Sequence, residues 1–239
     1  MYCFDSELCA LIFDSVKDIE VSFRTKMVNE YALLTGDSHW FLRKGLYINE
    51  QVYEDTLGII RHEIDRSKKK EEFISHYYDT YHTPSFPPAW TTFEVVSFGT
   101  LSRLFSCLDS GIEPCKKIAA EFGLYDVKTL RNWIYAISIL RNCCAHHSRI
   151  WNRRFHVKTE LRHHTMYPFM DKDTVKTVKR NKLFAVLCCM KYFLNRVNPG
   201  NSFKEDLCRI FGTGGRLLRL KDMGFPEEWE GIGVWRKEQ

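Results

Sequence analysis

Apolar residues recur every three or four positions along almost the whole chain of 239 residues. The first series, between Asp5 and Leu34, consists of Leu8, Leu11, Ile12, Ile19, Phe23, Met27 and Tyr31. This spacing places apolar side chains on one face of an α-helix, whereas a strand alternates with a period of two. We find no convincing alternation over five or more residues, and the chain has only 13 Gly and 7 Pro. The sequence therefore predicts an all-α fold.

Glycine, proline and polar residues interrupt the periodic segments and divide them into separate helices. The predicted helices span approximately residues 5–34, 51–67, 71–81, 89–108, 114–122, 127–151, 174–196 and 203–211. We expect one helical-bundle domain over residues 1–215. Residues 216–239 are expected to form a C-terminal tail that packs on this domain through Trp229 and Trp235.

Composition limits the class of protein and its location. Hydrophobic residues make up 44% and charged residues 27% of the chain, which excludes a disordered or collagen-like protein. The net charge of +5 permits an anionic partner without requiring one. Nine cysteines without a CxxC motif, no secretory leader and no long apolar run predict a cytoplasmic protein with free thiols and no membrane contact.

The predicted helix over residues 127–151 has two distinct faces. An apolar seam, which we expect to face the core, consists of Leu130, Trp133, Ile137, Leu140 and Cys144. A polar stripe with the same spacing consists of Arg131, Tyr135, Ser138, Asn142, His146, Arg149 and Arg153. Arg141 lies about 140° from His146 on an ideal helix, so it flanks this stripe unless the helix is irregular near Ala145.

Such a stripe is open to three interpretations: a solvated surface, a phosphate-binding face or a catalytic site. Arginine binds phosphate through two parallel hydrogen bonds, and histidine transfers protons near neutral pH. Together they suit RNA cleavage without a metal, because the ribose 2′-OH supplies the nucleophile. Two chains meeting at this helix would bring two such histidines together.

Several segments resemble one known family. Residues 141–152, RNCCAHHSRIWN, resemble the RNxxAHHxRxWN signature of the Abi (abortive infection) family of bacterial phage-resistance proteins. Residues 87–102 resemble its PPxW…EvxSFGxLS segment, and residues 118–124 resemble the stretch between these two segments. Residues 2–8 and 19–21 resemble its YxFDxxLR…IEV region, although Cys9 replaces the arginine and Met1 directly precedes Tyr2, so the chain is expected to be short at this end. The resemblance covers roughly residues 1–155.

This resemblance implies an all-α protein of the wider HEPN group, whose Rx4–6H motif forms metal-independent ribonucleases that act as dimers. Arg141 matches the motif arginine and would hold the phosphate, Asn142 matches the polar second position, and His146 would move the proton. His147 also fits the spacing, and Arg149 is an additional candidate. We favour His146 because it shares a helical face with Asn142, whereas His147 continues the apolar seam.

Further basic residues are candidates for contacts with the RNA backbone, namely Arg153, Arg154, Lys179, Arg180 and Lys182. We expect no cofactor and no metal, because Cys143, Cys144, His146 and His147 are too close in sequence to converge on one ion. The predicted partners are an RNA substrate, a second copy of the chain and, by the resemblance, a non-coding antitoxin or guide-like RNA. A non-catalytic RNA-binding module and a structural dimeric interaction protein remain alternatives.

Overall fold

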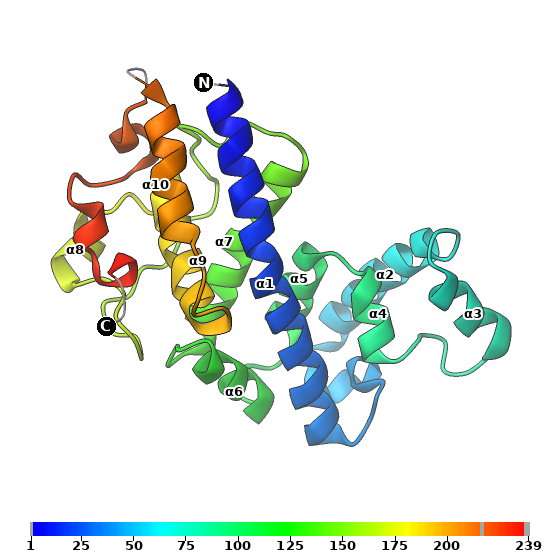
Figure 1. The fold of residues 1–239 in the computed structure, drawn as a ribbon. Coiled ribbons are helices and arrows are strands. Elements are labelled where there is room, and N and C mark those ends of the chain that lie inside the picture. The colour runs from blue at the N-terminus through cyan, green and yellow to red at the C-terminus, as the bar shows by residue number, and fades with distance from the viewer. Residues whose placement is uncertain (1, 216–217, 237–239) are drawn as a thin grey trace. The chain divides into compact units, whose positions relative to one another are not determined.

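The computed structural model describes residues 2–215 and 218–236, and these form ten α-helices joined by turns and short 3-10 segments (Figure 1). Within these ranges there is no β-strand, and one isolated bridge joins Tyr47 to Leu108. The prediction of an all-α fold is confirmed. None of the helices in the described part of the chain is both long enough and apolar enough to cross a membrane.

The chain forms two compact units. The terminal unit contains the described parts of Met1–Val21 and Ala120–Gln239, and the central unit contains Ser22–Ala119. The boundaries lie inside α1 (Tyr2–Thr35) and α6 (Glu113–Glu121).

In the central unit, α2 (Glu50–Ser67) packs against α4 (Ala89–Val95) and α5 (Phe98–Cys107), and α3 (Glu72–Thr80) follows α2 along the chain. The prediction of one continuous helix over residues 89–108 is wrong, because the chain turns at Val96 and Ser97. The Ser97 hydroxyl accepts a hydrogen bond from the Thr100 amide and so caps α5. The Glu63 carboxylate accepts hydrogen bonds from the Ser97 amide at 2.7 Å and from the Thr100 hydroxyl at 2.7 Å. A negative charge at a helix start stabilises it.

In the terminal unit, α7 (Val127–Ala145) packs against α9 (Leu183–Val197), which is buried along most of its length. Cys188 and Cys189 are fully buried core residues there. The unit also contains α10 (Phe203–Thr213). Trp229 and Trp235 are both buried, and the Trp235 indole donates a hydrogen bond to Cys188 Sγ at 3.2 Å. The predicted start of a C-terminal tail, at residue 216, lies outside the described residues.

The prediction of one helix over residues 174–196 is also wrong. Helix α8 (Lys172–Thr177) ends before residues 179–182, and α9 begins only at Leu183. The carbonyl oxygens of this connection accept hydrogen bonds from another segment. The Phe155 amide donates to Asn181 O and the Thr159 amide donates to Arg180 O, both at 2.9 Å. These bonds replace the helical ones and place residues 155–159 beside residues 180–181.

Candidate functional site

Helix α7 ends at Ala145 rather than continuing to Trp151. Its predicted apolar seam is confirmed, because Leu130, Trp133, Ile137, Leu140 and Cys144 are all buried. At its end the His147 amide donates to Cys144 O at 3.0 Å and the Ser148 amide donates to Cys143 O at 2.9 Å. His147 has a φ of 51°, so this is a Schellman-type helix end with histidine at the left-handed position that glycine usually occupies.

This helix end overturns two predictions. The polar stripe does not continue past Ala145, so His146, Arg149 and Arg153 do not share a helical face with Asn142. The reason for favouring His146 over His147 is therefore wrong, because His147 leaves the apolar seam and is exposed, as His146 is. The Asn142 side chain makes no hydrogen bond to another described residue, and only its carbonyl is used, by the His146 amide.

The loop after α7 is held by the first turns of α1. The Asp5 carboxylate accepts hydrogen bonds from the Ile150 amide at 3.2 Å and from the Trp151 amide at 2.7 Å. Farther along the two helices, Cys9 lies beside Cys144 and Glu20 lies beside Arg141. Since α1 residues of rising number meet α7 residues of falling number, the two segments run antiparallel. The sequence prediction missed Asp5 and Glu20, although both lie in the YxFD and IEV segments.

A hollow of about 300 Å³ lies between these two segments. Its lining comes from the first turns of α1 and the end of α7, and consists of Tyr2, Asp5, Ser6, Cys9, Ala10, Phe13, Cys144, Ala145 and His147. It therefore contains one of the two signature histidines, His147. Nothing in the sequence pattern singles out Phe13 or Ser6 as members of a site.

The motif arginine lies beside this hollow. The Arg141 guanidinium carbon is 5.1 Å from the ring centroid of Phe13, which lines the hollow. Arg141 Nε lies 3.7 Å from Glu20 Oε2, and the two side chains are 28% and 12% exposed. At this distance the two side chains form an ion pair without a hydrogen bond from Nε. His147 therefore lines the hollow, whereas Arg141 does not line it and contacts it through Phe13.

The cysteine thiols near His147 have shifted pKa values, in opposite directions. A hydrogen bond with Cys9, together with burial, raises the pKa of Cys144 far above its ordinary value. Burial also raises the pKa of Cys143, and the hydrogen bond with Cys144 lowers that of Cys9. Among the described residues no group of three or more His, Cys, Asp or Glu side chains is arranged to hold a metal ion.

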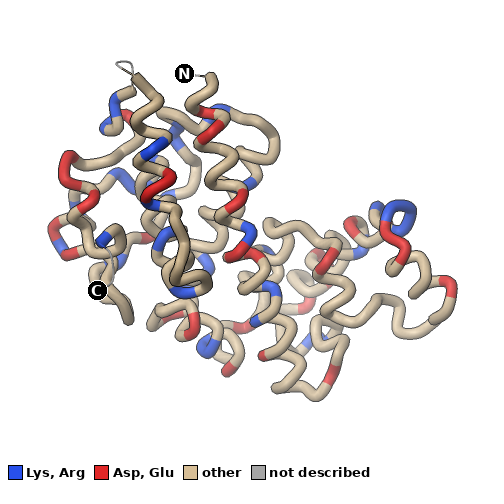
Figure 2. The backbone as a smooth tube through the Cα atoms, viewed as in Figure 1, with Lys and Arg blue, Asp and Glu red and all other residues tan. Residues whose placement is uncertain are grey.

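The residues predicted to contact the RNA backbone divide into two groups. Arg154, Lys179 and Arg180 are exposed, and the pairing of residues 155–159 with 180–181 brings their segments side by side. Arg153 is half-buried and donates to Arg149 O at 3.2 Å. Arg154, Lys179 and Arg180 therefore form a local basic group, and Figure 2 shows further Lys and Arg elsewhere along the trace.

Lys182 does not belong to this surface group, and its assignment as an RNA contact is wrong. Its side chain is 8% exposed, and its ammonium donates to Asn152 Oδ1 at 2.7 Å and to Asp222 O at 2.8 Å. Burial, with smaller contributions from Arg154 and Lys179, lowers the pKa of Lys182. Asn152, the last residue of the signature, has a φ of 53° and is held by this lysine. Lys182 is therefore a structural anchor.

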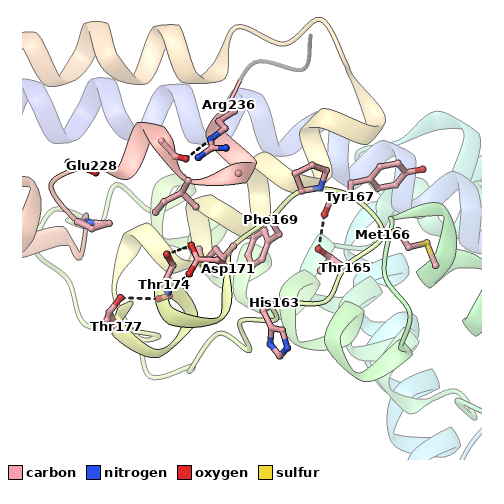
Figure 3. Close-up of a pocket in the computed structure, with 16 residues that line it drawn as sticks. His163, Thr165, Met166, Tyr167, Phe169, Asp171, Thr174, Thr177, Glu228 and Arg236 are labelled. Atoms are coloured by element: carbon pink, nitrogen blue, oxygen red, sulfur yellow. Dashed lines mark hydrogen bonds between the residues drawn. The ribbon is translucent and has the colours of Figure 1, made fainter.

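A larger cavity of about 750 Å³ lies in the terminal unit among residues 163–177 and 226–236 (Figure 3). Several of its polar groups are paired with one another: Thr174 donates to the Asp171 carboxylate, Thr165 to Tyr167 O, and Arg236 to Gly231 O. None of the signature residues 141–152 lines this cavity. The hollow beside His147 is therefore the better candidate site, despite its smaller volume.

Comparison with known proteins identifies the family. No curated protein and no solved structure is significantly similar to the chain. A family model described as Abi-like protein matches residues 1–152, a range that contains both sides of the hollow, Arg141 and both signature histidines. Because this match covers more than half of the 239 residues, the chain belongs to the Abi-like protein family.

Proposed function

We propose that this protein is a metal-independent endoribonuclease of the HEPN type. Membership of the Abi-like family suggests a role in abortive infection, a form of phage defence. The observation that carries the step to RNA cleavage is that His147 lines the hollow whose Phe13 wall lies against Arg141. In this proposal His147 is the proton-transfer group and Arg141 is the phosphate-binding group.

In the proposed reaction, the ribose 2′-OH of the RNA attacks the adjacent phosphorus and the bond to the 5′-oxygen breaks. His147 takes the proton from the 2′-OH or gives one to the leaving oxygen, and Arg141 stabilises the negative charge that develops on the phosphate oxygens. The products carry a 2′,3′-cyclic phosphate and a 5′-OH. One side chain must accept the proton of the 2′-OH and another must donate a proton to the leaving oxygen, so we include a homodimer, which supplies two copies of His147, in the proposal. His146 is the alternative proton carrier. Asn142 and Arg149 are proposed as further phosphate contacts.

A cleavage assay with end-labelled single-stranded RNA tests this function. We expect products with 2′,3′-cyclic phosphate and 5′-OH ends that form equally in the presence of EDTA. A 2′-deoxy substitution at the cleaved nucleotide is expected to block the cut, because it removes the nucleophile. Cleavage that persists at the deoxy position, or that EDTA abolishes, would contradict the mechanism.

The second candidate is a non-catalytic protein that binds RNA, including a non-coding antitoxin RNA. The exposed group of Arg154, Lys179 and Arg180 favours this reading, because backbone contacts need no chemistry. Purification without nuclease, followed by the 260/280 nm ratio and sequencing of bound RNA, distinguishes the cases. A discrete bound RNA together with no cleavage by the freed protein supports the binding function.

Replacing Lys179 and Arg180 with alanine is expected to weaken RNA binding and to reduce its dependence on salt. Each lost phosphate contact lowers the slope of log K against log salt concentration by about 1. Binding titrations at several salt concentrations measure this slope. Lys182→Met is the matched control: it is expected to lower the melting temperature, because Asn152 and Asp222 O lose their donor, and to leave the slope unchanged. An unchanged slope in the double variant would remove this group from the RNA-binding surface.

A further inference from the structure

One wall of the hollow is an aromatic ring that the core does not use. The buried face of α1 includes Leu8, Ile12 and Val16, whereas Phe13 remains 43% exposed. Its neighbours in the lining include Ala10 and Ala145, whose small side chains leave room beside the ring. Aromatic rings next to arginine are the usual platforms on which single-stranded nucleic acids stack their bases.

The hollow also has the size and the polar groups that a flat heteroaromatic ring requires. Its volume of about 300 Å³ lies at the lower end of the range for small-molecule sites. Among the described residues, the Ser6 hydroxyl and the His147 ring have no hydrogen-bond partner, whereas the Asp5 carboxylate is used by Ile150 and Trp151. A hydroxyl both donates and accepts, so Ser6 suits the edge of a base.

From this geometry we propose that the hollow binds one unpaired nucleobase of a single-stranded RNA, stacked on Phe13, while Arg141 contacts the phosphate attached to it. The inference rests on the proposed function for its RNA substrate. It assigns Phe13 and Ser6 as the residues that place the substrate and give the site a base preference. An RNA duplex would be excluded, because a paired base is not free to enter the hollow.

Equilibrium binding of two fluorescent probes tests this proposal. The first is a 2′-O-methyl adenosine 12-mer, which cannot be cleaved because its 2′-oxygen is blocked, and the second is an abasic 2′-O-methyl backbone of the same length and charge. We expect the native protein to bind the adenosine 12-mer more tightly than the abasic one. The quantity compared is the base-preference ratio, the dissociation constant of the abasic 12-mer divided by that of the adenosine 12-mer. Phe13→Leu is expected to reduce this ratio by about 10-fold, since stacking is lost but the charge is unchanged.

Phe73→Leu is the matched control, because Phe73 is 44% exposed and lies in α3 of the central unit. It is expected to keep the native ratio. A second variant, Ala10→Trp, fills the hollow and is expected to lower the base-preference ratio as Phe13→Leu does. Phe13→Tyr keeps an aromatic ring and is expected to keep the native ratio. A native ratio in Phe13→Leu and Ala10→Trp, with both variants folded by circular dichroism, would overturn the proposal.

The same titrations separate this inference from the proposed function. A ratio that depends on Phe13 in a protein that cleaves no RNA supports the base pocket and contradicts the ribonuclease. Cleavage by a protein whose ratio does not depend on Phe13 contradicts the pocket alone. If the native protein binds neither 12-mer, both proposals fail.

Discussion

Replacing His147 with glycine is expected to make the protein more stable and inactive at the same time. His147 occupies the left-handed position at the end of α7, with a φ of 51°. A side chain at this backbone conformation costs about 1 kcal/mol that glycine does not. For a chain of this length the gain corresponds to a rise in melting temperature of about 2–4 °C. Loss of the imidazole should lower the rate of cleavage by about 10²- to 10⁴-fold.

The opposite signs of the two effects make this variant informative. Strained residues persist where function requires them, so a histidine at a glycine position is a reason to look for chemistry there. His146→Gly is the control, because His146 has a φ of −93° and gains nothing from glycine. Calorimetry and the cleavage assay measure both quantities on the same samples. Full activity in His147→Gly, combined with an inactive His146→Ala, would transfer the proton-carrying role to His146.

How much of the site could be predicted from the sequence depends on which interactions shape it. The apolar seam of α7 follows from local periodicity, and its buried residues are as predicted. The position at which α7 ends does not follow from the local sequence, because no glycine or proline marks it. Hydrogen bonds from Ile150 and Trp151 to Asp5, about 145 residues away in the chain, hold the loop instead. A long-range contact of this kind leaves no periodic signal.

The same reasoning explains the error at Lys182. A lysine within a run of basic residues predicts a solvated side chain. Here the acceptors Asn152 Oδ1 and Asp222 O, which are distant in sequence, satisfy its ammonium inside the protein. The break between α8 and α9 has a related origin, since residues 180–181 bond to residues 155–159. The family resemblance, in contrast, rests on residue identity and not on local conformation, and the family match over residues 1–152 confirms it.

Replacing Arg141 with alanine is expected to lower the rate of RNA cleavage by about 10²- to 10³-fold, the usual effect of removing one donor that stabilises transition-state charge. Arg141→Lys is expected to recover only part of this loss. Lysine keeps the positive charge, but it lacks the planar fork that binds two phosphate oxygens and lies against the Phe13 ring. Single-turnover kinetics with excess enzyme separate the cleavage step from RNA binding.

The control for charge is Arg103→Ala, since Arg103 is exposed on α5 in the central unit and is not part of the site. It should bind and cleave RNA within about 2-fold of the native protein, because one exposed surface charge outside the site is largely screened at physiological salt. Arg141→Ala also deprives the Glu20 carboxylate, which is 12% exposed, of a cation 3.7 Å away. Adding Glu20→Gln to Arg141→Ala should therefore not restore cleavage. If this double variant regained the native rate, Arg141 would be a structural partner of Glu20 and the phosphate-binding role would be contradicted.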